Sequence, residues 1–167
     1  MMNFRYFDTP IGEMIAVSND LGICLLEFRD RKDIDAVLRR IENDFGETIE
    51  VGNNPHLDLL THELTAYFMG KLTEFSVNVT TQGTAFQKEV WSALQTIPYG
   101  QTKTYGEIAK AIQNPNSVRA VGAANGNNRV AIIIPCHRVI GAYGKLTGYA
   151  GGLWRKEWLL KHEGILL

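Results

Sequence analysis

The segment TYGEIAKAIQNPNSVRAVGAA, residues 104–124, predicts two short helices joined by a tight turn. Thr104 can cap a first helix that carries Ile108 and Ile112 on one face. The turn-forming residues 113–116 end this helix, and a second helix follows from residue 116 or 117 to Ala124. Such a pair is a candidate helix-turn-helix, although many helical proteins contain similar pairs.

The second of these helices consists mostly of residues with a very small side chain or none. Ala120, Gly122, Ala123 and Ala124 leave almost nothing that could reach the edges of bases, so we expect no sequence-specific readout. Small residues would let the backbone approach DNA closely, while Arg119 would contact phosphate without regard to sequence. Tight packing of the same small residues against another helix is an equally good interpretation of this composition.

Charge is distributed unevenly along the chain, although the net charge of the 167 residues is only −1. Residues 1–83 hold 7 Lys and Arg against 14 Asp and Glu, a net charge of −7. Residues 84–167 hold 10 against 4, a net charge of +6. A basic part beside an acidic part suggests that the second part meets a polyanion, with a harmless uneven surface as the alternative.

The turn-rich residues 80–83 separate these two parts, so we expect domains over residues 1–83 and 84–167. The first part has alternating apolar patterns typical of strands and two helical patterns, which predicts a small α/β sheet with helices. The expected strands are 4–7, 14–17, 23–28 and 75–79, and the expected helices are 33–43 and 57–68. No catalytic motif appears in this part.

The second part is expected to be mainly helical, and it contains the strongest chemical signal. Thr84 can cap a helix that ends at Pro98-Tyr99-Gly100. After an apolar run over residues 130–134 comes Pro135-Cys136-His137-Arg138-Val139. A thiol is a useful nucleophile as thiolate, and an imidazole and a guanidinium nearby would favour that form. A lone Cys-His pair is nevertheless more often structural than catalytic.

The remaining composition excludes other classes of protein. Cys24 and Cys136 lie in no pattern with metal-ligand spacing, so we expect two free thiols and no metal site. No apolar run is long enough for a membrane-spanning helix, and residues 1–5 lack the features of a signal peptide. We therefore expect a cytoplasmic protein, or a nuclear one in a eukaryote, with no membrane partner.

The segment 135–139 resembles the active-site signature of the O6-alkylguanine-DNA alkyltransferase family. Five other segments are similar to that family in order and approximate spacing, namely residues 86–91, 97–100, 119–122, 148–152 and 156–160. Together they cover nearly the whole second part. The resemblance implies a ribonuclease-H-like first domain and a mainly helical second domain with a helix-turn-helix.

The resemblance also implies roles for individual residues of a catalytic set. Cys136 would accept the alkyl group, and His137 would deprotonate it through a water molecule. Glu163 would orient and polarise His137, following the logic of a nucleophile, base and orienting acid. Asn128 would brace the segment that precedes Cys136. Tyr105 would donate a proton or hydrogen bond to guanine N3 as the base leaves.

Further residues are implied in binding the base and the duplex. Val139, Tyr149 and Ala150 would line the pocket for the extruded base, with the Ala150 amide reaching O6. Arg119 would enter the base stack in place of the rotated nucleotide. Gly106, Ala120 and Gly122, with Tyr105 and Arg119, would form the DNA-binding face; Ala150 stands where some family members have serine.

The implied reaction is a single-turnover transfer of an alkyl group from O6-alkylguanine, and also O4-alkylthymine, to Cys136. Damaged duplex DNA would be the partner of a monomeric protein, and no cofactor would be needed because the lesion is the donor. Two other functions stay open on the residues alone. One is a cysteine hydrolase that uses Cys136, His137 and Glu163, and the other is a DNA-binding regulator without transfer chemistry.

Overall fold

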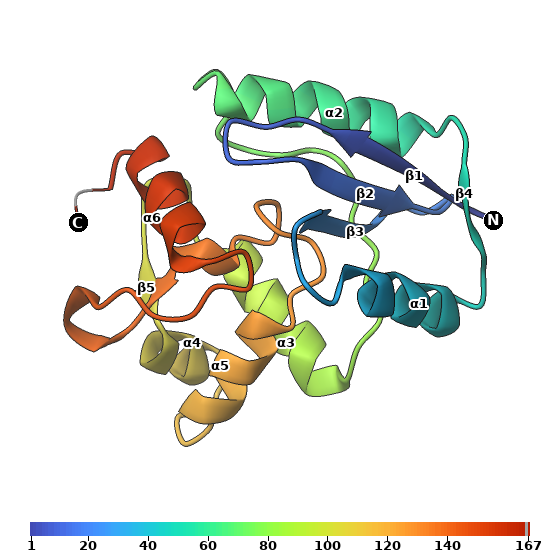
Figure 1. Ribbon diagram of the computed structural model, residues 1–167. Coiled ribbons are helices and arrows are strands. Elements are labelled where there is room, and N and C mark those ends of the chain that lie inside the picture. The colour runs from blue at the N-terminus through green and yellow to red at the C-terminus, as the bar shows by residue number, and fades with distance from the viewer. Residues whose placement is uncertain (166) are drawn as a thin grey trace. The chain divides into compact units, whose positions relative to one another are not determined.

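A four-stranded sheet forms the centre of the first of two units, Met1–Gln82 and Gly83–Leu167, into which the chain divides. The computed structural model describes residues 1–165 and 167 (Figure 1). The strands are β1 (Met2–Phe7), β2 (Met14–Ser18), β3 (Ile23–Phe28) and β4 (Ile49–Val51). Their order is β3-β2-β1-β4, with β4 parallel to β1 and the other neighbours antiparallel.

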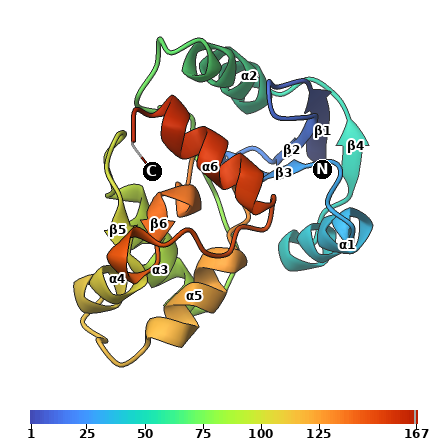
Figure 2. The same cartoon turned by 60° about the vertical axis from the view of Figure 1, so that its left-hand side comes forward.

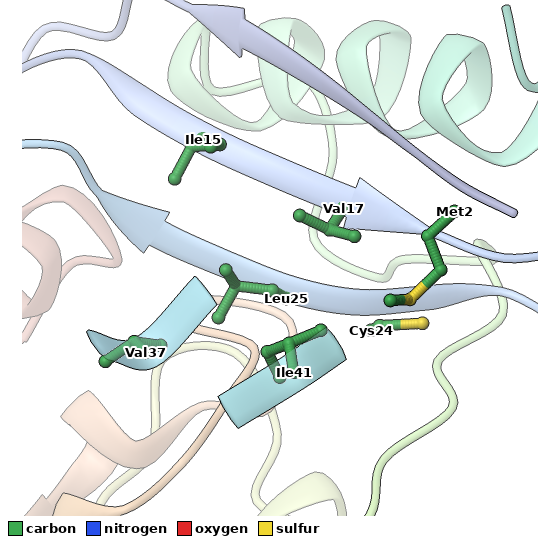
Figure 3. Close-up of a cluster of buried hydrophobic side chains, with 7 residues drawn as sticks. All are labelled: Met2, Ile15, Val17, Cys24, Leu25, Val37 and Ile41. Carbon is green, nitrogen blue, oxygen red and sulfur yellow. The ribbon is translucent and has the colours of Figure 1, made fainter. Parts of the chain in front are cut away.

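Two helices cover opposite faces of this sheet. The helix α1 (Ile34–Phe45) packs Val37 and Ile41 onto a cluster of buried side chains from the strands (Figure 3). On the other face, α2 (Pro55–Phe68) is linked to β1, because Arg5 donates to Asp58 at 2.7 Å. All residues of β2 and β3 are buried, as expected for strands covered on both faces.

The predicted strand over residues 75–79 is wrong, because this segment forms only a single bridge, between Val79 and Ile23. The cause is the buried carboxylate of Glu63 on α2, which accepts the backbone N–H groups of Ser76 and Val77 at 2.9–3.0 Å. Those N–H groups are therefore not available for a ladder. The three-residue strand β4 was not predicted, since it is too short to show alternation.

The second unit consists of helices around a small parallel pair of strands (Figures 1 and 2). Its elements are α3 (Ala85–Gln95), β5 (Lys103–Thr104), α4 (Tyr105–Ala111), α5 (Val118–Gly126), the 3-10 turn η1 (Cys136–Arg138), β6 (Val139–Ile140), the 3-10 turn η2 (Ala142–Gly144) and α6 (Leu153–His162). The expected mixed α/β fold, with a sheet first and a helical region second, is thus confirmed. The two-residue strands β5 and β6 were not predicted.

Side-chain caps define where α3 and α4 begin. Thr84 and Thr104 each accept from the backbone N–H three residues ahead, at 3.1 Å in both cases. The side chains of Gln87 and Glu107 return the bond, so both helices start with a complete capping box. The indole of Trp91 on α3 donates to the carbonyl of Ala124 on α5 at 2.9 Å, which joins two helices of the core.

Cys24 and Cys136 are both buried, and no disulfide joins them. Burial raises the pKa of Cys24 to about 12, so this thiol in the first unit is unreactive at neutral pH. Within residues 1–165 and 167, no helix has the length and apolarity to cross a membrane.

Candidate active site

Cys136 is positioned by a tight turn at Pro135. Pro135 has φ −81° and ψ 63°, and the N–H of Cys136 donates to the carbonyl of Ile134 at 2.8 Å, which is the geometry of an inverse γ-turn. The turn leads directly into η1, whose first residue is Cys136. From α5, the amide of Asn125 donates to the Cys136 carbonyl at 3.4 Å. Cys136 therefore lies on a backbone held from both sides, with only 6% of its surface exposed.

Asn128 holds the segment that enters this turn. Its amide nitrogen donates to the carbonyl of Ile134 at 2.8 Å, and its oxygen accepts the N–H of Val130 at 3.0 Å. Between these two anchors, Ile132 is forced into the left-handed region at φ 71°, which costs a β-branched residue about 1–3 kcal/mol. Asn128 is buried, so these bonds form in a region of low dielectric and hold the strained segment in place.

His137 and Arg138 of η1 both bind the same carboxylate. His137 Nε2 lies 2.7 Å from Oε2 of Glu163, the C-cap residue that follows α6. Arg138 donates from Nε to Oε1 of Glu163 at 2.7 Å and from Nη2 to Oε2 at 3.2 Å. The imidazole and the carboxylate of this pair are fully buried. The structure thus brings Glu163 into contact with His137 and Arg138, the two residues that follow Cys136 in the sequence.

The ionisation states of Glu163 and His137 depend on their burial and on the charged groups around them. Burial raises the pKa of Glu163, but the hydrogen bonds and charges of His137 and Arg138 lower it more, to about 2. Burial lowers the pKa of His137, and the charges of Arg138 and Lys156 lower it further, against the opposing effect of Glu163. Glu163 is therefore ionised and His137 neutral at pH 7. Nδ1 of His137 is buried with no hydrogen-bond partner among the residues described.

Lys156 is a site residue to which sequence reasoning assigned no role. It is fully buried on α6, and burial lowers its pKa to about 8 while the charge of Cys136 raises it. Its ammonium donates to the carbonyls of Thr147 and Gly148 at 2.7 and 3.2 Å. A cation in electrostatic range of Cys136 favours the thiolate. The only signal in the sequence was its place in a segment that resembles the alkyltransferases.

Tyr105 begins α4 and faces the loop between η2 and α6. Its hydroxyl donates to the carbonyl of Thr147 at 3.3 Å, and its ring lies 5.8 Å from the ammonium of Lys156. Val139 is fully buried next to η1, Tyr149 is half-buried, and Ala150 is exposed on the same loop. Lys156 thus contacts both the loop and the ring of Tyr105, and it interacts electrostatically with Cys136, although the three come from different elements.

The residues predicted to meet DNA lie mostly on the surface of the second unit. Arg119 and Ala120 are exposed at the start of α5, and Gly106 on α4 and Gly122 on α5 are half-buried. A Cβ atom built on Gly122 would find no heavy atom within 4 Å. Close packing against a neighbouring helix of this unit therefore does not explain the glycine at this position.

Known proteins share both the sequence and the fold of this chain. A family model described as "6-O-methylguanine DNA methyltransferase, DNA binding domain" matches residues 85–165, and one described as its "ribonuclease-like domain" matches residues 2–81. The methylated-DNA–protein-cysteine methyltransferase of Methanosarcina acetivorans is 48% identical over 166 residues, which are 98% of this chain and 99% of that protein.

Solved structures agree with these matches. The crystal structure of Mycobacterium tuberculosis O6-methylguanine methyltransferase has a TM-score of 0.83 at 44% identity, over 98% of this chain and 93% of that one. A structure of Mycobacterium tuberculosis OGT in complex with DNA has a TM-score of 0.82 at 44% identity, over 96% and 92% of the two chains. The chain described here belongs to the 6-O-methylguanine DNA methyltransferase family.

Proposed function

We propose that this chain is a methylated-DNA–protein-cysteine methyltransferase that reverses alkylation damage by moving the alkyl group from guanine O6 onto Cys136. The observation that carries the proposal is the buried bond of 2.7 Å between His137 and Glu163, on the residue next to the thiol. That bond leaves Nδ1 of the neutral imidazole as a proton acceptor, on the residue that follows Cys136 in the sequence. The near full-length similarity to proteins of that name supports the same conclusion.

The transfer proceeds as a displacement at a saturated carbon. The thiol proton passes to Nδ1 of His137 through a water molecule, and Glu163 stabilises the resulting imidazolium. The thiolate sulfur then attacks the alkyl carbon, and the C–O6 bond breaks with its electron pair going to the guanine. Tyr105 supplies a proton or hydrogen bond at N3 as the base leaves. The product is a thioether, which water does not hydrolyse, so each molecule reacts once.

The alkylated base is bound in a pocket formed by the loop before α6. Val139, Tyr149 and the backbone of Ala150 contact the base, and the carbonyl of Cys136 accepts from its exocyclic amine. Lys156 holds this loop through the carbonyls of Thr147 and Gly148. The same pocket admits O4-alkylthymine, because the attacked carbon is bonded to an equivalent exocyclic oxygen.

The domain expected over residues 84–167 binds the duplex through α4 and α5, which form a helix-turn-helix. The open space around Gly122 supports this assignment, because it lets the backbone of α5 approach a groove. The exposed Arg119 fills the gap that the extruded nucleotide leaves in the stack. Residues 1–83 form a ribonuclease-H-like domain, and a monomer contains every residue of this site. A reducing compartment such as the cytoplasm suits a protein that needs a free thiolate.

A stoichiometry experiment separates this function from its two alternatives. The protein is titrated into a fixed amount of duplex that contains one O6-methylguanine, and the repaired fraction is measured by chromatography of the digested DNA. We expect repair to stop at one lesion per protein molecule. A cysteine hydrolase would leave the lesion intact and turn over an activated ester. A DNA-binding regulator would bind the duplex and leave its composition unchanged.

A further inference from the structure

Arg138 is buried on η1, with 6% of its surface exposed, and three of its nitrogens donate hydrogen bonds. Nε and Nη2 bind the two carboxylate oxygens of Glu163 at 2.7 and 3.2 Å. Nη1 binds the carbonyl of Ile97, in the loop after α3, at 2.7 Å. The guanidinium therefore fixes both the position and the charge of the carboxylate that His137 also contacts.

We propose that Arg138 is a positioning residue of the transfer reaction, which holds Glu163 oriented and charge-balanced so that His137 stays neutral and can accept the thiol proton. The inference rests on the function proposed above, and it adds a fourth member to the Cys136, His137 and Glu163 set. Arg138 acts through Glu163, since its hydrogen bonds are to Glu163 and Ile97.

The need for such a residue follows from the electrostatics of a buried carboxylate. Glu163 favours a proton on His137, and burial together with the charge of Arg138 opposes it; the opposition matters because an imidazolium is not a base. The guanidinium makes a bidentate pair with the carboxylate, which balances its charge without a transferable proton. The charge of Arg138 also opposes protonation of His137 directly, and lowers the pKa of the imidazole.

Two other charged groups affect the pKa of His137, and two uncharged polar residues lie around this cluster. Lys156, on α6, also lowers the pKa of His137, and Glu163 at the end of α6 is the group that raises it. On the loop after α3, the ring of Tyr99 lies 5.9 Å from the Arg138 guanidinium. From α5, the neutral amide of Asn125 reaches the Cys136 carbonyl. Removing the charge of Arg138 therefore raises the pKa of His137, because one of the charges that oppose Glu163 is lost.

Two variants separate this role from plain structural support. Arg138→Gln keeps hydrogen-bonding groups but removes the charge, whereas Arg138→Lys keeps the charge but cannot form the bidentate pair. The rate of transfer from a duplex with O6-methylguanine is measured against pH for both and for the native protein. We expect the acid limb of the R138Q profile to move up by about one pH unit. For R138K we expect the acid limb to stay in place and the plateau of the transfer rate to be severalfold lower.

A second readout does not depend on DNA. The rate at which iodoacetamide alkylates Cys136 is followed against pH by peptide mass, and the same upward shift is expected for R138Q. If the native protein fails on lesion DNA, the proposed function is lost, while the iodoacetamide profiles still test Arg138. If R138Q is uniformly slower at every pH with its acid limb unmoved, Arg138 is only structural and the inference is overturned.

The thermal midpoint of R138Q reports whether this variant folds. If it does not fold, a measurement on the native protein tests the inference instead. Nitrogen-15 NMR of the imidazoles distinguishes protonated from bare ring nitrogens. We expect His137 to carry a proton on Nε2 alone at pH 7 and to stay in this form below pH 6.5, its ordinary pKa. An imidazolium at His137 at pH 7 would overturn the inference.

Discussion

Glu163 decides the electrostatics of the site, because it is the acceptor shared by His137 and Arg138. It lies 25 and 26 residues from these two partners, and no spacing rule connects them. A carboxylate this deeply buried is stable only because two donors satisfy it. The resemblance to the alkyltransferases pointed to Glu163, while the residues alone predicted only the Cys136–His137 pair.

Replacement of Glu163 by Gln is expected to change how stability depends on pH. The folded-state pKa of about 2 lies below the ordinary value of 4.5, so the stabilisation is complete above pH 4.5 and is lost as the pH falls toward 2. The difference amounts to about 3 kcal/mol. Urea unfolding at several pH values should show a steeper loss between pH 4.5 and 2 for the native protein than for E163Q. Parallel curves would contradict this prediction.

Among the single residues of the site, Cys136 was predicted from the sequence and the charged Lys156 was not. Cys136 was identified from its own chemistry and from the residues around it. Lys156 was not given a role, because the approach of α6 to η1 is a tertiary contact that a linear pattern does not contain. Asn125 was missed for the same reason, since its bond to the Cys136 carbonyl depends on how α5 packs.

Asn128 is expected to stabilise the segment that leads to η1. Asn128→Ala removes two strong bonds to the backbone, at Ile134 and Val130, and deprives the buried N–H of Val130 of its acceptor. We expect a loss of about 2–3 kcal/mol in the free energy of unfolding, together with slower transfer. Denaturant unfolding measures the first effect. Asn127→Ala, at the exposed neighbouring position, is the control and should change stability by less than about 0.5 kcal/mol.

Gly122 tests whether α5 leaves its small residues open for DNA rather than for packing. Gly122→Ala should raise the free energy of unfolding by about 0.5–1 kcal/mol, because alanine favours the helix and no atom lies within 4 Å of the new Cβ. Gly152→Ala is the contrasting control. Its φ of 95° and the contact at 3.2 Å with Trp154 make that change destabilising. A loss of stability in G122A would favour the packing interpretation.

The elements that the sequence predicted well are those with long periodic patterns or clear caps. The helices at α1, α2 and α3 and the first three strands were expected close to their observed bounds. The predicted strand over residues 75–79 does not form because Glu63 accepts the N–H groups of Ser76 and Val77, 13 and 14 residues later, which pairing would use. The strands β4, β5 and β6 hold two or three residues each, which is too few for a period to appear.

The uneven charge of the whole chain leads to a prediction about DNA affinity. With a net charge of +6 on residues 84–167, binding to duplex should weaken steeply as salt rises, because counterions are released from phosphate. Arg119→Ala should lower the slope of log K against log salt by about one. Fluorescence anisotropy with a labelled duplex measures both. Arg39→Ala, an exposed arginine in the acidic part, should leave the slope unchanged. Equal slopes for the two variants would remove Arg119 from the interface.

Peptide mass spectrometry tests most directly whether the sulfur of Cys136 receives the alkyl group. The protein is incubated with duplex containing O6-methylguanine, digested, and compared with Cys136→Ser treated in the same way. We predict that the peptide containing Cys136 gains the mass of one methylene group in the native protein, and that no peptide of C136S gains it. An unmodified Cys136 after complete repair of the duplex, or a methyl group found on another residue, would contradict the account.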